Sequence, residues 1–206
     1  MTSKTMAAAQ TCSADDVLAL IKSRRTAGRI HPERLPPREQ IERLLEAFTW
    51  APNHKLTQPW RFFIITGEAR KAMGDLYRSI VLADAPDSPE LRMRADIAAK
   101  KPSRAPVTIM VVCQTAEGPP RLRKEDYAAC AAGIQNMLLL EMSMGLAAKW
   151  NTGALIDDEH FKRHYGLPPT AEVVGLVYLG YADGVLPPPS PRRPISELIQ
   201  WLGDTP

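Results

Sequence analysis

The chain has 206 residues, 45% of them hydrophobic, which is enough to bury a sizeable core and too few for two independent domains of ordinary size. Its 26 basic and 23 acidic residues are interleaved and give a net charge of +3, which does not indicate nucleic-acid binding. Three widely spaced cysteines favour a reducing, cytoplasmic compartment. No stretch reaches the roughly 20 apolar residues of a membrane span. We expect a flexible leader over residues 1–13 and a single domain over 14–206.

The first predicted helix starts at Ser13, which pairs with Asp16 as a capping box, and it runs to about Thr26 before Gly28 ends it. The pattern then predicts a helix after Pro36-Pro37 that Pro52 stops, a strand at 61–66, a helix at 68–83, a loop at 84–89 and a short basic helix before Pro102. We expect the 84–104 segment to cover a binding pocket.

In the second half of the chain, the residues after Ala105-Pro106 are β-branched and predict a buried strand at 107–113. The remaining predicted elements are a long helix at 124–146, a loop at 149–153, a short helix at 157–165, a strand at 173–179 and a proline-rich tail with a small amphipathic segment at 195–202. Three strands alternating with helices indicate an α/β or α+β class around one sheet.

The long helix at 124–146 is apolar nearly all round. A helix that is hydrophobic on every side has to be covered on every side. It is therefore either the central core helix of a monomer or a helix that packs against a second subunit.

Arg24, Arg25 and Thr26 form the first candidate binding motif. Two guanidinium groups and a hydroxyl at a helix end are suited to a phosphate, because each charge-assisted hydrogen bond to it is strong. The alternative is structural, since the helix dipole alone favours cations at a helix C-terminus.

The stretch APNHKLTQPWRFF, residues 51–63, is the second candidate, because Asn53, His54, Lys55 and Gln58 stand directly before a strand that begins near Trp60. These donors suit the edge of a flat ligand such as a flavin, whose pyrimidine end gains negative charge on reduction. The alternative is a capped turn before a core strand. No strand is followed by GxGxxG, and His160 and His164 lack the glutamate of a zinc protease, so we predict neither a Rossmann site nor a metal site.

Four motifs, in this order, resemble the FMN-dependent nitroreductase family, and most closely its small, single-domain YdjA-like branch. They are Ser23-Arg24-Arg25-Thr26, the run from Ala51 to Phe62, Arg104-Ala105-Pro106, and Trp150-Asn151-Thr152-Gly153. The resemblance implies an α+β fold with a central mixed or antiparallel sheet flanked by helices. It also implies an intertwined homodimer with two FMN sites at the subunit interface.

The resemblance also implies which residues contact FMN. From one subunit these are Arg24, Arg25 and Thr26 at the phosphate, ribityl chain and pyrimidine edge, and Trp150, Asn151, Thr152 and Gly153 along the ring. From the other subunit they are Pro52, Asn53, His54 and Leu56, while Arg192 or Arg193 is expected to add a phosphate contact.

The implied activity is that of an oxidoreductase that takes hydride from NADH or NADPH onto FMN. It then reduces a nitroaromatic, a quinone or a related acceptor in a ping-pong cycle. The alternatives are a flavin carrier or sensor without turnover and an enzyme that consumes reduced flavin. Thr26, His54-Lys55 and Asn151 depart from the family pattern of serine, a Ser/Thr pair and arginine, and these departures bear on the substrate more than on the cofactor.

Overall fold

The structure is a computed structural model that describes residues 12–115 and 118–203. Residues 1–11 of the predicted leader lie outside the described residues. The first helix, α1 (Ala14–Ser23), has the predicted capping box, in which the Ser13 hydroxyl accepts from the Asp16 N–H and the Asp16 carboxylate accepts from the Ser13 N–H. It ends three residues earlier than predicted, because Arg24 turns extended and the following residues run beside the sheet.

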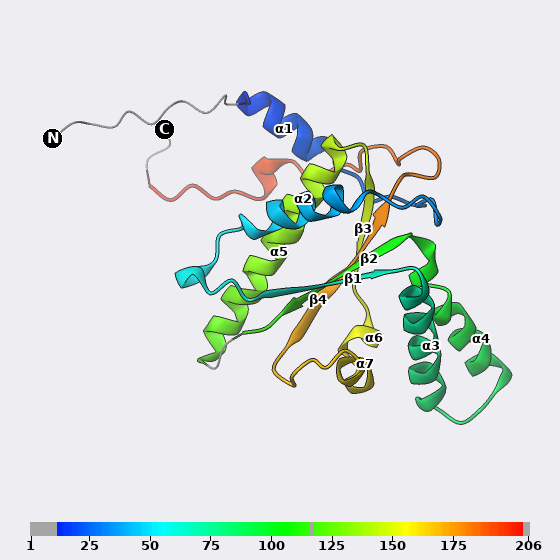
Figure 1. The fold of residues 1–206 in the computed structure, drawn as a ribbon. Helices are drawn as coiled ribbons and strands as arrows, with labels where there is room; N and C mark the ends of the chain where they lie inside the picture. The colour runs from blue at the N-terminus through cyan, green and yellow to red at the C-terminus, as the bar shows by residue number, and fades with distance from the viewer. Residues whose placement is uncertain (1–11, 116–117, 204–206) are drawn as a thin grey trace.

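A four-stranded antiparallel sheet forms the centre of the fold (Figure 1). Its order is β1 (Trp60–Thr66), β2 (Val107–Cys113), β4 (Glu172–Gly180) and β3 (Ala147–Asn151). The α+β prediction is confirmed. The predicted loop at 149–153 is wrong for Lys149 to Asn151, which belong to β3, because these residues pair with Leu176 to Tyr178 of β4.

Helices cover both faces of the sheet. On one face, α2 (Arg38–Thr49) and α5 (Pro120–Ser143) pack over a core that includes Phe48, Ile109, Ile134 and Val177. The other face carries α3 (Glu68–Ala83), α4 (Pro89–Ala99), α6 (Ala154–Asp157) and α7 (Glu159–His164). The short helix predicted at 157–165 is present as α7 but begins two residues later, because Asp158 is extended and its carboxylate caps α7 by accepting from the N–H groups of His160 and Phe161. The preceding α6 was not predicted.

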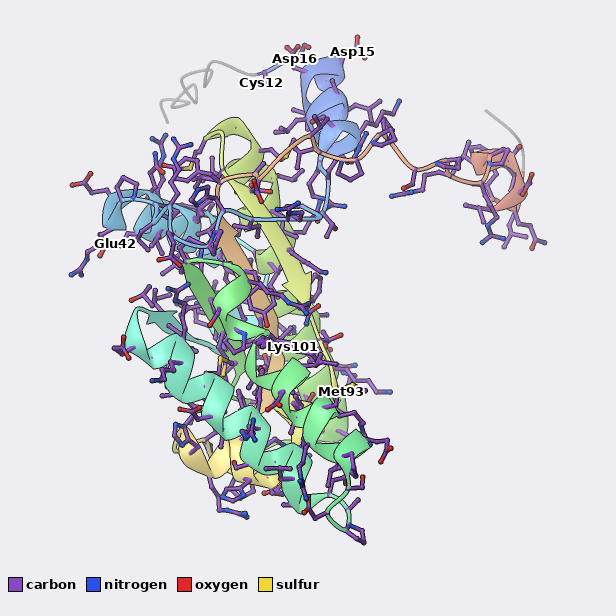
Figure 2. All side chains as sticks on the ribbon, turned by 90° about the vertical axis from the view of Figure 1, so that its right-hand side faces the viewer. Cys12, Asp15, Asp16, Glu42, Met93 and Lys101 are labelled. Atoms are coloured by element: carbon purple, nitrogen blue, oxygen red, sulfur yellow. The ribbon has the colours of Figure 1, made fainter. Side chains whose placement is uncertain are left out.

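Two apolar segments are left uncovered in this single chain. No residue of α1 is buried, and Val17, Leu18 and Ile21 are each nearly half exposed. Figure 2 shows the C-terminal segment, which contains Trp201, extending away from the rest of the molecule. Of the amphipathic segment predicted at 195–202, only a 3-10 turn, η3 (Ile195–Glu197), is present.

Within the two described ranges, no helix is both long enough and apolar enough to cross a lipid bilayer.

Candidate functional site

Two adjoining cavities, of about 610 and 680 Å³, lie beside β3 on the face of the sheet that α3 and α4 cover. Both are lined by Lys101, Asn151, Thr152 and Tyr178. Their volumes are in the range of small-molecule and cofactor sites. Lys101, which is labelled in Figure 2, lies just past the C-terminus of α4. Part of the 84–104 segment therefore borders the cavities.

The wall on the outer side of β3 is formed by the residues that follow α1. The Ala27 N–H donates to the Ala148 carbonyl at 3.0 Å, and the His31 N–H donates to the Tyr181 carbonyl at 2.8 Å. Arg29 forms an ion pair with Asp183 at 2.7 Å. These backbone bonds hold residues 27–31 along the edge of the sheet.

The 680 Å³ cavity is strongly cationic. Its lining contains Arg29, Lys101, Arg104 and Lys149 against one carboxylate, Asp183. An anionic or electron-rich ligand is favoured there, because its charge is stabilised in a partly enclosed site. Sequence reasoning assigned no role to Lys101, Arg104 or Lys149, although Arg104 belongs to one of the motifs that carried the family resemblance.

Tyr178 projects from β4 into the boundary between the two cavities and is 6% exposed. Burial raises the pKa of its phenol, and the charge of Arg104 offsets part of that rise. The phenol is therefore a neutral hydrogen-bond donor at physiological pH. No sequence signal identified this residue, because it lies inside a continuous apolar strand pattern.

The predicted phosphate residues lie at the end of α1, close to this edge of the sheet. Arg24 and Arg25 are half-buried and Thr26 is exposed. The Arg25 guanidinium donates to the carbonyls of Lys22 and Arg24 at 2.6 and 2.8 Å. In the single chain, Arg25 therefore caps α1, as the structural alternative expects, while the Thr26 hydroxyl has no hydrogen bond to any described residue.

Residues 150–153 divide between the two faces of the sheet. Asn151, Thr152 and Gly153 line the cavities. Trp150 packs against the opposite core, and its indole N–H donates to the Val174 carbonyl at 3.3 Å. Its side chain is held by the close approach to Gly175, where an added Cβ would lie 2.1 Å from the indole nitrogen. The structure thus places the Trp150 indole away from the cavities.

The polar turn at 51–59 precedes β1 and has a strained backbone. Lys55, Leu56 and Gln58 have positive φ angles of 52°, 53° and 45°. Asn53 braces the turn, since its amide donates to the Ala51 carbonyl at 3.1 Å and its side-chain oxygen accepts from the Gln58 N–H at 3.0 Å.

A second brace joins the turn to α5. The Thr57 hydroxyl donates to the carboxylate of Asp126, which is 1% exposed, at 2.8 Å. With the turn held in this way, Pro52, His54 and Leu56 are exposed. Leu56 is 75% exposed, a large value for an apolar side chain.

The turn and the cavities lie at opposite edges of the sheet. The strand order places β1 and β3 three positions apart, about 14 Å at about 4.8 Å per strand. The turn and the cavities are also displaced along the strand direction. Trp60, which follows the turn, pairs with Cys113, and Cys113 pairs with Glu172 at the start of β4. Asn151, which lines the cavities, pairs with Leu176, four residues further along β4. One chain therefore does not bring Pro52, Asn53, His54 and Leu56 together with Asn151 and Thr152. Arg193 is exposed on the C-terminal segment and lines neither cavity.

A family model described as the Nitroreductase family matches residues 21–181. The chain belongs to the nitroreductase family. It is 34% identical over 167 residues to the Escherichia coli (strain K12) protein described as "Putative NAD(P)H nitroreductase YdjA", a match that spans 80% of this chain and 87% of that protein. The corresponding relative YfhC of Bacillus subtilis (strain 168) is 29% identical, over 86% of this chain and 90% of the relative.

Solved structures agree with the nitroreductase fold. The nitroreductase-like family protein from Bacillus cereus superimposes with a TM-score of 0.80 at 29% identity, over 95% of this chain and 99% of that chain. A nitroreductase from Bacteroides fragilis, solved with bound FMN, superimposes with a TM-score of 0.67 at 24% identity, over 91% and 99% of the two chains.

In this nitroreductase-family chain, the donors beside β3 suit a planar, electron-rich ligand. Asn151, Thr152 and Tyr178 supply neutral hydrogen-bond donors, and Lys101 and Arg104 supply positive charge. Gly153 leaves open space, because a Cβ built there meets nothing within 4 Å. The site can therefore hold a flavin ring against the sheet and stabilise negative charge on it.

Proposed function

We propose that this chain is an FMN-dependent NAD(P)H oxidoreductase that reduces nitroaromatics, quinones or related acceptors. The observation that carries the proposal is the cationic cavity pair beside β3, lined by Asn151 and Thr152 in a member of the nitroreductase family. The FMN-bound structure of the Bacteroides fragilis relative supports the choice of cofactor.

The residues present suit each part of FMN. Arg24, Arg25 and Thr26 would hold the phosphate, with Arg193 of the exposed C-terminal segment as a further candidate. Asn151 and Thr152 would donate to the ring edge, while Lys101 and Arg104 would stabilise the negative charge that reduction places there. Bound FMN would supply two-electron chemistry, accepting hydride from NADH or NADPH and passing it to the acceptor.

The protein groups in this reaction position and polarise the reactants. The open side of the cavities would receive the nicotinamide first and the acceptor second, which gives a ping-pong cycle. No side chain has to accept or donate a proton during hydride transfer. The lysine and arginine side chains lower the energy of the charged state of the ring, and the apolar residues of the 610 Å³ cavity, such as Ile80 and Ile97, limit access of water.

We propose that two copies of the chain complete each site. The turn at 51–59 would contribute His54 and Leu56 to a cavity of the partner subunit. The exposed apolar face of α1 and the C-terminal segment offer surface for the same contact, since exposed apolar patches of this kind mark protein interfaces. The long helix α5 keeps a half-buried apolar strip, including Leu139 and Met142, that a second subunit would cover.

The decisive experiment is a visible spectrum of the purified protein with added FMN, before and after anaerobic addition of NADH or NADPH. We expect a yellow dimer that bleaches with a nicotinamide and regains colour with a nitroaromatic or quinone. Arg25→Ala should release FMN, because one charge-assisted contact is worth about 1.5–3 kcal/mol, or about 10- to 100-fold in the Kd.

Arg123→Ala is the matched control, since Arg123 is exposed at the start of α5 and lines neither cavity. Bound FMN that neither nicotinamide reduces would replace the proposal with a carrier or sensor. Stoichiometric loss of FMN under oxygen would indicate a flavin-consuming enzyme instead. Failure to bind FMN at all would refute both the cofactor and the activity.

A further inference from the structure

Two phenol side chains border the 610 Å³ cavity, and the proposed chemistry leaves one of them, Tyr77, without a role. Tyr77 of α3 and Tyr178 of β4 both line this cavity, and they are 2% and 6% exposed. Among residues 12–115 and 118–203, neither phenol oxygen forms a hydrogen bond, and neither is one of the fully enclosed polar atoms that lack a partner. Each hydroxyl is therefore open to the cavity. Because buried polar groups are almost always paired, two unpaired donors at one cavity point to a ligand that accepts hydrogen bonds.

The two phenols are held in place by different elements of the fold. The Tyr77 ring stacks on Phe161 of α7, with 5.9 Å between the ring centroids, and Phe161 is fully buried. Tyr178 lies between Thr108 of β2 and Lys149 of β3, the residues directly opposite it on the two neighbouring strands. Both donors are thus in position before a ligand binds, which is the arrangement that stabilises developing charge most effectively.

The rest of the 610 Å³ cavity suits a neutral aromatic molecule. Its two acidic residues, Asp84 and Asp158, balance its two basic residues, Arg94 and Lys101. The other cavity instead has four basic residues against one acidic residue. The remaining wall of the 610 Å³ cavity is largely apolar and includes Ile80, Val81, Ile97, Ile156 and Leu176. The cationic cavity therefore favours the anionic cofactor, and the balanced cavity favours an uncharged reactant.

We propose that Tyr77 and Tyr178 donate hydrogen bonds to an oxygen atom of a neutral aromatic acceptor, a quinone carbonyl or a nitro group, that lies in the 610 Å³ cavity. This inference rests on the proposed function, because the electrons come from the cofactor that a nicotinamide has reduced. Tyr178 borders both cavities and Tyr77 borders this one alone, so Tyr77 is the residue that separates the acceptor from the cofactor.

The two phenols stabilise charge and keep their own protons. A quinone becomes a hydroquinone by gaining two electrons and one proton as hydride and a second proton from water. A nitro group that gains the same two electrons and two protons becomes a nitroso group and releases water. Negative charge develops on the acceptor oxygen before the second proton arrives, and two neutral donors lower its energy. Burial raises the pKa of both phenols, so they remain protonated while they do so.

The first test measures binding without reaction. Nitrobenzene and toluene have similar shapes, and only nitrobenzene has oxygen atoms. Each is titrated into the oxidised holoenzyme without a nicotinamide, and binding is followed by the change in flavin absorbance. We expect Tyr77→Phe to weaken the binding of nitrobenzene about three- to ten-fold, as the loss of one neutral hydrogen bond implies, and not to weaken that of toluene.

The second test compares acceptors in turnover. Ferricyanide takes one electron at a time and no proton, so it does not depend on donors to an oxygen atom. We expect Tyr77→Phe to lower the ratio of kcat/KM for duroquinone to that for ferricyanide about 10- to 100-fold, because these donors act most strongly in the transition state. Nitrobenzene in place of duroquinone shows whether a nitro group uses the same donors as a carbonyl.

Tyr165→Phe is the matched control, because Tyr165 packs against the same Phe161 but lines neither cavity, and it should behave as the wild type in both tests. If Tyr178→Phe loses FMN, Tyr77→Phe decides. Unchanged nitrobenzene affinity in Tyr77→Phe, an equal loss for toluene, or an equal fall in the rate with ferricyanide would overturn the inference while FMN binding stands. A wild-type protein that does not bind FMN would instead refute the proposed function.

Discussion

The two edges of the sheet are built in different ways. At the β3 edge, the residues after α1 are held by backbone hydrogen bonds to Ala148 and Tyr181, and they border a preformed cavity. At the β1 edge, a turn with three positive φ angles is held by side chains, through Asn53 and the contact of Thr57 with Asp126. Backbone pairing tolerates many substitutions, whereas a turn braced by side chains depends on particular residues.

In the proposed dimer, each edge of a single chain would contribute half a site. The β3 edge provides a cavity with cations and hydrogen-bond donors, and it is open on one side. The β1 edge projects His54 and Leu56 into solvent and borders neither of the two cavities. Two copies related by a twofold axis would bring the projecting turn of one chain to the open cavity of the other, twice.

The prediction with the largest expected effect concerns FMN binding by two variants, each damaged at a different edge of the sheet, and by dimers that combine them. An Arg24→Ala, Arg25→Ala double variant damages the β3 edge, and an Asn53→Ala, His54→Ala double variant damages the β1 edge, so neither should hold FMN alone. After unfolding and refolding together in equal amounts, half of the dimers should be mixed, and each mixed dimer should contain one intact site. We expect FMN on about a quarter of the sites, measured by flavin absorbance after gel filtration.

The same mixture distinguishes sites shared between chains from sites within one chain. If both groups of residues served a cavity of their own chain, each chain of a mixed dimer would still carry one damaged group. The mixture would then stay as colourless as its parents. Refolding each variant alone provides the control for loss of FMN during the procedure.

A second prediction concerns the contact between Trp150 of β3 and Gly175 of β4. In Gly175→Ala the new Cβ would lie 2.1 Å from the Trp150 indole nitrogen and 3.1 Å from the Asn151 carbonyl oxygen. Trp150 has to move, which strains β3 and displaces the neighbouring Asn151. We expect a loss of about 2–3 kcal/mol in the free energy of unfolding, measured by urea denaturation, together with weaker FMN binding.

Gly28→Ala is the control for this substitution in stability measurements, because a Cβ at Gly28 meets nothing within 4 Å. Unchanged stability of Gly175→Ala would mean that the contact of Trp150 with β4 does not fix this edge of the sheet.

The sequence predicted the parts of the fold that are encoded locally. The Ser13 and Asp16 pair identified the start of α1, and Pro52 identified the end of the second helix before a polar turn. The strand β3 was missed because Lys149, Trp150 and Asn151 have no alternating pattern. They become a strand through pairing with β4, more than 20 residues away, where Gly175 makes room for the indole.

For the candidate site too, the sequence identified residues that are adjacent in one motif and missed residues that come together only in the fold. Asn151 and Thr152 were found because they are adjacent in one motif, and the structure does place them at the cavities. Lys101, Lys149 and Tyr178 come from different elements and meet only after the sheet has formed, so no spacing in the sequence relates them.

The prediction with the smallest expected effect concerns the hydrogen bond between Thr57 and Asp126 at the β1 edge. Thr57→Val keeps the shape of the side chain and removes the hydroxyl that donates to Asp126. The other oxygen of Asp126 already has no partner among the described residues, so the substitution leaves the whole buried carboxyl unpaired. We expect a loss of about 1–2 kcal/mol in the free energy of unfolding, measured by urea denaturation, and weaker FMN binding because the turn is freed. Thr57→Ser retains the hydroxyl and should restore both. If Thr57→Val bound FMN as tightly as the wild type despite lower stability, the brace would serve folding alone and the backbone of the turn would keep its geometry without it.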